Sequence, residues 1–388
     1  MKDNQVDIII MSDNNHNTVG GEQESTKIIL QGLNDTKYHI GVIHPGIEFS
    51  NNLDKVEYFH LTNESRIKHL VKSPVEFFKY IFKTKSLIKS TRPKVIHTQA
   101  QVSFFIVAFL KKWNLIPREF TFIHTERGLY LKYNFLFKKL FVYFMNQLDL
   151  LVTTTEYNMN SWKIALKNQK LEKFLVIPNT AGGEFEEFDE NLKKEKRTDG
   201  KFVVGFAGRY CDWKNWPLSV EIVEKLNERI NEDLKVKMAV GCLDKASLTS
   251  TQEMFRYLEE MLKDRFEGKI NIPITEMNDF YYDIDAFILT SNKNTESFGR
   301  TLVEAMSRKN VVFTTPAGGS EEVVPSSENV FSSVDEVVGK MTDLIENEEL
   351  LVTAQSLGLR HVRQNYSLEN NINLHRALYE EIIGGNSK

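Results

Sequence analysis

The stretch Phe202–Arg229 has the sequence FVVGFAGRYCDWKNWPLSVEIVEKLNER, and it decides the fold. It opens with a nearly continuous apolar run, turns at Gly208, and carries apolar residues at helical spacing from Trp216 onward. Apolar runs of this kind are typical of parallel strands, because helices cover both faces of a parallel sheet. A strand, a glycine turn and a helix in this order predict a doubly wound α/β sheet.

The same alternation extends along the chain in both directions from this stretch. Downstream, the pattern predicts a helix over 251–264 and strands at Val236–Val240, Ile270–Ile274, Ala286–Leu289 and Val311–Thr314. Upstream, it predicts strands at Asp7–Met11, Tyr38–Ile43, Val56–His60, Lys94–His97, 120–124, 149–153 and 174–177, with helices between most of them. Two sets of alternating elements therefore predict two doubly wound domains.

A break in the pattern separates the two sets. Ala181–Lys201 (AGGEFEEFDENLKKEKRTDGK) is rich in glycine and charge and poor in aliphatic residues, as interdomain linkers are. We predict an N-terminal Rossmann-like domain over 1–180 and a C-terminal one over 201–366. A last helix over about 367–383, capped by Ser367, is expected to pack back on the N-terminal domain. The two domains would face a central cleft lined by the carboxyl ends of both sheets, where ligands of open α/β sheets bind.

Composition supports a globular protein of two domains. The chain has 388 residues, of which 41% are hydrophobic and 26% are charged. The longest nearly apolar run, Val102–Leu110, is much shorter than a membrane span, and the N-terminal apolar run is too short for the core of a signal peptide. Cys211 and Cys242 are the only cysteines, so no disulfide framework or structural zinc is indicated. These features predict a cytoplasmic protein.

The charge is distributed unevenly. Residues 1–180 contain 24 Lys and Arg against 16 Asp and Glu, and the remainder contains 25 against 37. Two basic and aromatic stretches, Ser73–Lys94 and Leu131–Leu151, are predicted as amphipathic helices. Such helices can bind an anionic membrane surface, which would place the protein at the inner face of the cell membrane. The alternative is that their aromatic residues fill the core while the lysines face water.

The most specific motif is Thr295–Met306, TESFGRTLVEAM. Glu296 and Glu304 are eight residues apart, and a helix is expected to begin at about Gly299. The free amides and the dipole of a helix start attract anions. One carboxylate could then bind hydroxyl groups while the amides hold a phosphate. The alternative is a surface helix with two unrelated glutamates.

A second motif, Gly205–Trp216 (GFAGRYCDWKNW), directly follows a strand. Gly208 permits a sharp turn, and Arg209 and Lys214 place two cations in one loop. Arginine can bind phosphate with two parallel hydrogen bonds, whereas lysine acts as a point charge. The chain has no GxxxxGK[ST] motif, so the loop is not a nucleotide-binding P-loop. An exposed arginine and lysine without a ligand remain the alternative.

Four smaller features lie at other predicted strand ends. Gly20-Gly21 opens the first helix, where glycine allows close approach to a ligand. His124 ends the strand 120–124, although a lone histidine is more often structural than catalytic. Asn179 follows the last strand of the first half, and Gly318-Gly319 follows the last strand of the second half.

Taken together, these motifs resemble the retaining glycosyltransferases of family four, which have the GT-B fold. By that resemblance, Arg209 and Lys214 would hold the diphosphate of a sugar donor, Glu304 the ribose, and Glu296 the sugar. His124 would face the 6-position of the sugar, and Gly20-Gly21 would approach the phosphates or the acceptor. The donor-binding set implied by the resemblance also includes Gly208, Ser297, Phe298, Gly299, Arg300 and Thr301.

The resemblance implies transfer of a hexose from a nucleotide-diphosphate sugar, with a uridine base guessed, to a glycan or lipid-linked acceptor of the cell envelope. Neither a cofactor nor a metal is expected, because two cations face the leaving diphosphate and Asp283-Ile284-Asp285 precedes a buried strand. Two alternatives stay open, a nucleotide-sugar epimerase of the same fold and a non-catalytic module that binds carbohydrate or nucleic acid. Nucleic acid is not expected as a partner, because the acidic half would repel it.

Overall fold

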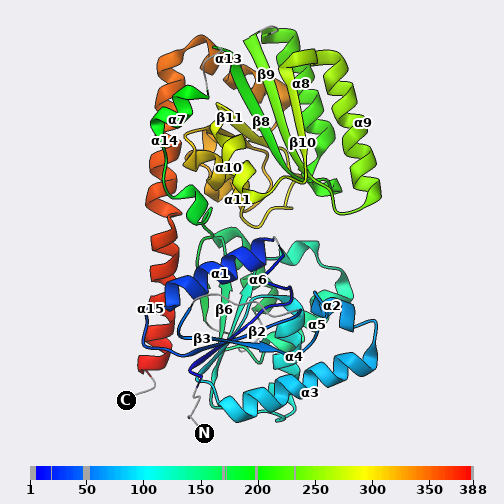
Figure 1. The fold of residues 1–388 in the computed structure, drawn as a ribbon, viewed down its shortest axis with the longest axis vertical. Helices are drawn as coiled ribbons and strands as arrows, with labels where there is room; N and C mark the ends of the chain where they lie inside the picture. Colours follow the sequence, from blue (N-terminus) through cyan, green and yellow to red (C-terminus); the bar gives the residue numbers. More distant parts are fainter. Residues whose placement is uncertain are drawn as a thin grey trace. The chain divides into compact units, whose positions relative to one another are not determined.

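The computed structural model describes residues 6–18, 20–46, 53–167, 171, 173–196, 200–230 and 233–385. Contacts divide the chain into two compact units, each with its own sheet. Unit 1 comprises Met1–Pro178 and Glu369–Lys388, and unit 2 comprises Asn179–Leu368. Both sheets are parallel and carry helices on their faces, so the predicted α/β class with two Rossmann-like sheets is confirmed (Figure 1).

Unit 1 contains a seven-stranded parallel sheet in the order β3-β2-β1-β4-β5-β6-β7. Its strands are β1 (Ile8–Met11), β2 (Ile40–His44), β3 (Val56–His60), β4 (Val95–Thr98), β5 (Thr121–Glu126), β6 (Leu150–Thr153) and β7 (Phe174–Val176). In the centre of the sheet, Ile9 of β1 pairs with Gly41 on one side and Ile96 on the other. The order reverses between β1 and β4, as in doubly wound sheets.

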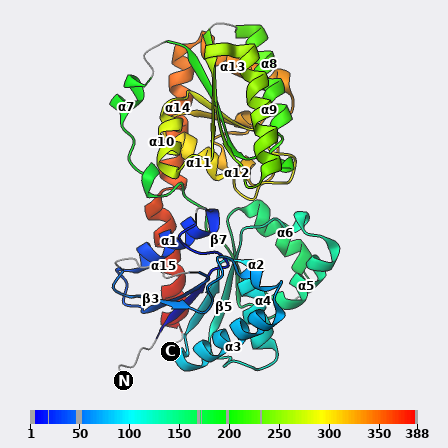
Figure 2. The same ribbon diagram turned by 45° about the vertical axis from the view of Figure 1, so that its right-hand side comes forward.

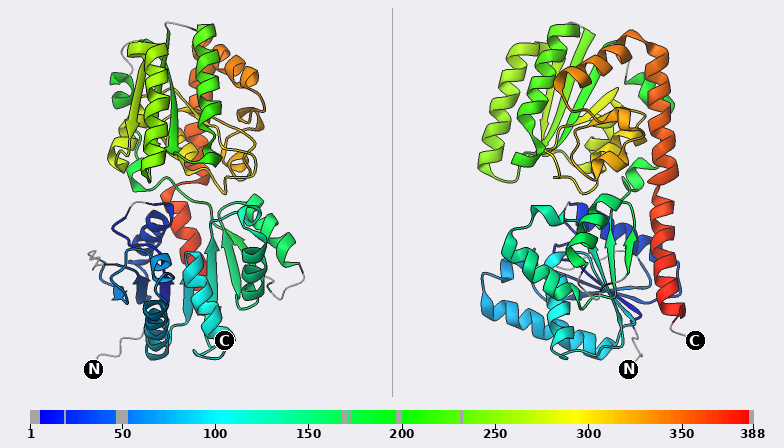
Figure 3. Two further views of the ribbon diagram at one scale, coloured as in Figure 1. Left: turned by 90° about the vertical axis from the view of Figure 1, so that its right-hand side faces the viewer. Right: turned by 180° about the vertical axis from the view of Figure 1, so that it is seen from behind.

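The two faces of this sheet are covered by different helices (Figures 2 and 3). Ile9 and Met11 of β1 point into a core shared with α3, α4, α5 and α6, while Ile8 and Ile10 point into a core shared with α1 and α15. The helices of unit 1 are α1 (Gly21–Leu33), α2 (Ile67–Leu70), α3 (Pro74–Thr91), α4 (Gln101–Lys112), α5 (Phe135–Met145), α6 (Glu156–Leu166) and α15 (Leu368–Gly385).

The last helix, α15, packs on unit 1 through specific contacts. The hydroxyl of Tyr379 lies 2.6 Å from Nδ1 of His97 in β4, and Nε of Arg376 donates to the carbonyl of Gly32 at 2.6 Å. A Cβ at Gly32 would lie 2.6 Å from the side chain of Ile372, so the glycine permits the close approach of α1 and α15. The chain thus returns to its first unit at its end.

Unit 2 contains a five-stranded parallel sheet in the order β10-β9-β8-β11-β12. Its strands are β8 (Phe202–Arg209), β9 (Leu234–Gly241), β10 (Phe266–Ile270), β11 (Ala286–Leu289) and β12 (Val311–Thr314). The helices are α7 (Glu190–Glu195), α8 (Trp216–Ile230), α9 (Lys245–Leu262), α10 (Ile274–Tyr282), α11 (Arg300–Ser307), α12 (Ser320–Val323), α13 (Val334–Glu346) and α14 (Glu348–Asn365). Two buried clusters, one on each face of the sheet, form the core.

Two predictions from the sequence are corrected by this structure. The strand predicted at Ile270–Ile274 is β10, which ends at Ile270, because Asn271 adopts a left-handed φ of 55° and Pro273 precedes α10. The segment Ala181–Lys201 was predicted as a linker, but its described residues up to Lys196 belong to unit 2. Lys193 is buried there, and its ammonium group donates to the carbonyl of Tyr281 at 3.3 Å and to Oδ1 of Asn310 at 2.6 Å.

Candidate functional site

The strongest candidate site lies at the carboxyl edge of the unit 2 sheet. β8 and β11 are neighbours there, and the chain leaves β8 toward β9 on one side and β11 toward β12 on the other. The loops that follow two such strands diverge, which makes this the usual ligand-binding position of an open α/β sheet. Lys214 lies in the loop after β8 and Glu296 in the loop after β11.

These two charged side chains form an ion pair. Nζ of Lys214 lies 2.9 Å from Oε1 of Glu296, and the same oxygen accepts a hydrogen bond from the Ser291 hydroxyl at 2.6 Å. The Lys214 and Glu296 side chains are only 14% and 13% exposed, so the pair is shielded from bulk water without being sealed from it. A Cβ at Gly208 would lie 3.5 Å from Cδ and Cε of Lys214, so the lysine stem passes directly over this glycine.

Hydrogen bonds between the two loops hold the pair in place. The Asn292 amide donates to the carbonyl of Trp213 at 2.8 Å, and the Thr290 hydroxyl donates to the carbonyl of Lys214 at 2.9 Å. Asp212–Lys214 form a single 3-10 turn, η3, and Asn215 follows it with a left-handed φ of 50°. The loop after β8 is therefore tied to the loop after β11 through its backbone.

The glycine pair Gly318-Gly319 fixes the backbone on the other side of Glu296. The amide of Glu296 donates to the carbonyl of Ala317 at 2.9 Å, and the amide of Gly319 donates to the carbonyl of Glu296 at 2.9 Å. Gly318 has a φ of 105°, a conformation that favours glycine. This glycine pair thus supports the site through the backbone of Glu296.

The second glutamate of the motif is oriented from two sides. Glu304, on α11, is 7% exposed, and its Oε2 accepts a hydrogen bond from the hydroxyl of Tyr281 at 2.9 Å. Oε1 of Glu304 lies 3.1 Å from Nε of Arg300, one helical turn earlier. Burial, followed by the charge of Glu304, raises the pKa of Tyr281 well above its usual value, so this hydroxyl remains a donor. Tyr281 is a site residue that the sequence motifs do not identify.

The residues between the two glutamates belong to the start of α11. Gly299 precedes the helix with a φ of 89°, and among the described residues no side chain caps this end. Phe298 is 3% exposed and its ring packs 5.5 Å from that of Tyr366, so only its backbone can face a ligand. Ser297 is partly exposed, and the buried hydroxyl of Thr301 has no hydrogen-bond partner within the described part of the chain. The helix start therefore has unused donors for an anion.

Arg209 is not part of this ion-paired group. It is the last residue of β8, its side chain is exposed, and its guanidinium carbon lies 5.8 Å from the ring centre of Trp213. Burial raises the pKa of the neighbouring Cys211, against the opposing effects of Arg209 and Lys214. The loop thus presents one restrained cation, Lys214, and one exposed cation, Arg209.

In unit 1, His124 has the surroundings of a structural histidine. It is fully buried in β5, and its ring lies 4.8 Å from that of Phe104. Nδ1 lies 2.9 Å from the hydroxyl of Thr98, and Nε2 lies 3.3 Å from Oε2 of Glu126. Because both ring nitrogens are occupied within unit 1, the structure favours the alternative in which this residue stabilises the sheet.

The carboxyl edge of the unit 1 sheet instead holds a partly buried polar network. Gly21 begins α1, and Oε1 of Glu22, the next residue, accepts from the amide of Asp13 at 2.9 Å. Asp13 in turn accepts from the amides of Val102 and Ser103 at 2.7 and 2.8 Å, at the start of α4. Burial raises the pKa of Glu22 to about 7, reinforced by the charge of Asp13. No sequence motif indicates this network, because its members come from separate strand ends.

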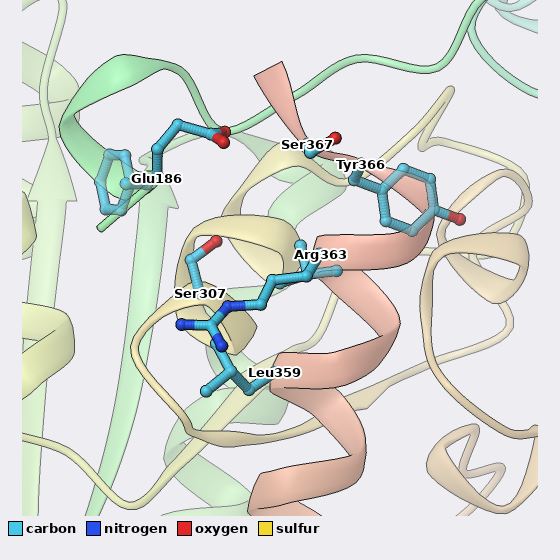
Figure 4. A pocket seen from close by; sticks show the side chains of 8 residues that line it. Glu186, Ser307, Leu359, Arg363, Tyr366 and Ser367 are labelled. Atoms are coloured by element: carbon cyan, nitrogen blue, oxygen red, sulfur yellow. The ribbon is translucent and has the colours of Figure 1, made fainter. Parts of the chain in front are cut away.

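Unit 2 also contains a pocket away from the loops after β8 and β11. A small pocket in unit 2, lined by Ser307, Arg363 and Tyr366 among others, lies at the end of α11 opposite Gly299 (Figure 4). It is therefore separate from the ion pair. Within the described residues, no group of three or more His, Cys, Asp or Glu side chains could hold a metal ion. In the same part of the chain, no helix is long and apolar enough to cross a membrane.

Part of unit 2 is similar to a known protein family. Residues 187–356 match the family model described as Glycosyl transferases group 1. A curated relative, the phosphatidylinositol N-acetylglucosaminyltransferase GPI3 subunit of Saccharomyces cerevisiae, is 25% identical over 308 residues. That alignment covers 76% of this chain and 64% of the relative, so the chain matches less than two thirds of that protein.

Solved structures show the fold over nearly the whole chain. Sucrose-phosphate synthase from Thermosynechococcus elongatus has a TM-score of 0.79 at 14% identity, covering 98% of this chain and all of that one. Anabaena HepE, in complex with UDP and glucose, has a TM-score of 0.72 at 16% identity, covering 96% and 99%. The fold of the chain is therefore that of the GT-B glycosyltransferases, and residues 187–356 resemble the group 1 glycosyl transferases.

Proposed function

We propose that this protein is a retaining glycosyltransferase that moves a hexose from a nucleotide-diphosphate sugar to a hydroxyl group of a glycan or lipid-linked acceptor. The observation that carries the proposal is the Lys214–Glu296 ion pair, 2.9 Å long, at the point of the unit 2 sheet where the strand order reverses. The start of α11 and the oriented carboxylate of Glu304 lie on the same segment of chain. A cation, a helix start and a carboxylate are what a diphosphate joined to a ribose requires.

In this proposal the cations stabilise the departing diphosphate. Breaking the bond between the anomeric carbon and the phosphate oxygen adds negative charge to the leaving group. Lys214 and the exposed Arg209 would be most favourable when that charge is fully developed, so they stabilise the transition state more than the ground state. The acceptor oxygen bonds to the anomeric carbon on the face that the diphosphate leaves, and its proton passes to the leaving phosphate oxygen. No divalent metal has a role in this scheme.

The glutamates divide the recognition of the donor. Glu304, held by Tyr281 and Arg300, would accept hydrogen bonds from the ribose hydroxyls. Glu296 would bind a hydroxyl of the sugar while its partner Lys214 faces the phosphate. The amides after Phe298 and Gly299, with Ser297 and Thr301, would complete the contacts. A uridine base is proposed for the donor, in line with the UDP and glucose bound by the structural neighbour HepE.

The acceptor is proposed to be a glycan or lipid-linked molecule of the cell envelope, on the cytoplasmic side of the membrane. The curated relative is named for transfer of N-acetylglucosamine to phosphatidylinositol, which is a lipid acceptor. The basic character of residues 1–180 suits an anionic membrane surface. Gly20-Gly21, at the start of α1, would lie close to the acceptor or the phosphates, and the space around the Cβ position of Gly21 is open.

The proposal is tested first by ligand binding and then by product formation. Nucleoside diphosphates and their sugars are screened for the increase in thermal stability that a ligand of the folded state produces. We expect the best diphosphate to raise the melting temperature of the wild type and to have a smaller effect on Glu296→Ala and Lys214→Ala.

Activity is then measured with the donor identified in this way, with and without acceptor lipids and glycans. The proposal predicts a product that keeps the anomeric configuration of the donor. An epimer formed from the nucleotide sugar alone would show that the protein is an epimerase. Binding of free glycans without any nucleotide affinity would identify a carbohydrate-binding protein.

A further inference from the structure

One face of unit 1 carries an unusual number of exposed apolar side chains. Helices α3, α4 and α5 share one core with the sheet, so they cover the same face of it (Figure 3). On α3, Phe78 and Phe82 are 59% and 62% exposed, and on α5, Phe135 and Leu136 are 72% and 76% exposed. The aromatic face, as we name it, consists of Val75, Phe78, Phe82, Phe109, Trp113, Phe135, Leu136, Leu140 and Tyr143.

These side chains are not simply the outer part of the core. Phe77 and Ile81 on α3, and Phe137 and Phe141 on α5, already fill the space against the sheet. The aromatic residues of the two helices are therefore divided between an inward set that packs and an outward set that does not. A large set of exposed apolar side chains on one face of a sheet is typical of an interaction surface in soluble proteins.

Lysines surround the aromatic face. Between Pro74 and Met145 the chain has 13 Lys and Arg but only three Asp and Glu. Some lysines lie directly over the exposed rings, with Nζ of Lys139 at 4.4 Å from the ring centre of Phe135 and Nζ of Lys112 at 4.1 Å from that of Tyr143. Lysine stems can lie along apolar surface while the ammonium groups reach a polar layer.

We propose that the aromatic face docks on an anionic phospholipid bilayer, with the outward side chains of α3 and α5 inserted among the headgroups. A bilayer provides negative charge and an apolar layer next to each other, which is what exposed rings between lysines require. A second copy of this chain would bring two strongly basic faces together, so charge argues against a dimer through this surface. The proposal does not depend on the proposed function, because docking needs neither donor nor acceptor.

The test is sedimentation of the full chain with lipid vesicles. The wild type is expected to bind vesicles of phosphatidylcholine with 30% phosphatidylglycerol at low salt, and to bind pure phosphatidylcholine vesicles much less. Binding is expected to fall steeply as salt rises, because surface charges are screened. Two double variants separate the contributions, Phe135→Ser with Leu136→Ser for insertion and Lys138→Glu with Lys139→Glu for charge.

Each double variant is expected to bind the anionic vesicles at least about tenfold more weakly than the wild type, since both apolar insertion and basic charge contribute to interfacial binding. The matched control is Leu243→Ser, which removes a 73% exposed leucine from unit 2 and should bind as the wild type does. Unchanged melting temperatures would show that the variants fold. Donor binding is measured separately, because it tests the proposed function and not the docking of the aromatic face.

Three outcomes would overturn the proposal. They are recovery of the wild type in the supernatant with anionic vesicles at low salt, binding that both double variants retain, and a dimer in solution that Phe135→Ser with Leu136→Ser dissociates. The last result would assign the aromatic face to a second copy of the chain.

Discussion

The two units have the same architecture but use the carboxyl edges of their sheets differently. In unit 2, that edge presents the partly exposed pair of Lys214 and Glu296, held by backbone hydrogen bonds. In unit 1, the equivalent edge holds a network around Asp13 and Glu22 whose oxygens are already hydrogen-bonded to amides, and His124 is enclosed below it. A parallel sheet therefore positions charges at one edge, and the two units pair them differently: a cation with a carboxylate in unit 2, and carboxylates with amides in unit 1.

The units also differ in where their histidines and apolar side chains lie. Unit 1 contains eight of the nine histidines, and His361 is the only one in unit 2. In unit 1 several histidines are buried while aromatic side chains of α3 and α5 are exposed. Unit 1 thus combines buried histidines with the exposed aromatic face.

The sharpest test of this contrast is Lys214→Ala. Removing a preplaced cation from a developing negative charge is expected to lower kcat by about 100-fold to 1,000-fold. The melting temperature should change little, because the ion pair is partly exposed. The control is Lys225→Ala, which removes an exposed lysine of α8 that pairs with Glu228 at 3.6 Å. Equal initial rates for the two variants would contradict the assignment of the site.

Acid should destabilise unit 1 before unit 2. Burial lowers the pKa of His16 to about 3 and the pKa of His44 and His375 to about 4, and it lowers the pKa of His97 as well. These histidines are neutral in the folded protein. Their contribution to the free energy of unfolding of unit 1 is therefore complete above about pH 6.5 and is lost as the pH falls toward 4. The expected loss in the free energy of unfolding of unit 1 is on the order of a few kcal/mol.

A carboxyl group in unit 1 opposes this trend. Because the pKa of Glu22 is raised to about 7, its burial costs stability above pH 7, and that cost is relieved as the pH falls. Hydrogen exchange from pH 7 to 4.5 can follow the amides of β1 and β4 against those of β8 and β11. Faster opening of unit 2 than of unit 1 over this range would contradict the contrast between the units.

A smaller effect is expected for Tyr281→Phe. The change removes the hydroxyl that donates to Glu304 and keeps the buried ring, so Glu304 loses one orienting partner. Loss of a hydrogen bond to a charged group should cost about 1.5–3 kcal/mol, seen as a higher KM for the donor with a smaller change in kcat. Tyr257→Phe is the control, since its exposed hydroxyl donates to Glu224 on the surface. A donor KM equal to that of wild type would show that Tyr281 does not position Glu304.

The smallest effect is expected on the stability of each unit when one of its glycines is replaced by alanine. Gly299→Ala places a Cβ at a φ of 89°, 3.1 Å from Leu302, and should destabilise unit 2 by about 1–2 kcal/mol. Gly21→Ala adds a Cβ with no atom within 4 Å at the first residue of α1, and should be neutral or slightly stabilising. Chemical denaturation measures both, and equal effects would remove the proposed strain at the start of α11.

The placement of Lys214 and Glu296 at one edge of the unit 2 sheet could be predicted from the sequence, because the carboxyl ends of parallel strands share one edge. Their contact depends on β8 and β11 being neighbours, which is seen only in the structure. The predicted bounds of β11 and β12 match the structure, since each is a clear apolar pattern between turn residues. Local patterns and one topological rule were sufficient there.

Features that depend on tertiary packing could not be predicted. Lys193 would be assigned to the surface by its charge, yet its ammonium group is buried among carbonyls of unit 2, and this fixes a segment expected to be a linker. Tyr281 reaches Glu304 from α10, whose start overlaps a residue predicted as strand. The division of the α3 and α5 aromatics into inward and outward sets likewise requires the positions of the helices on the sheet.

Hydrogen exchange of the full chain with and without UDP tests the central claim most directly, because it locates a bound diphosphate without requiring the acceptor. We expect UDP to slow amide exchange in residues 209–216 and 291–301 of the wild type, and to slow it little in Lys214→Ala. Protection confined to other segments, or the same protection in Lys214→Ala, would contradict it.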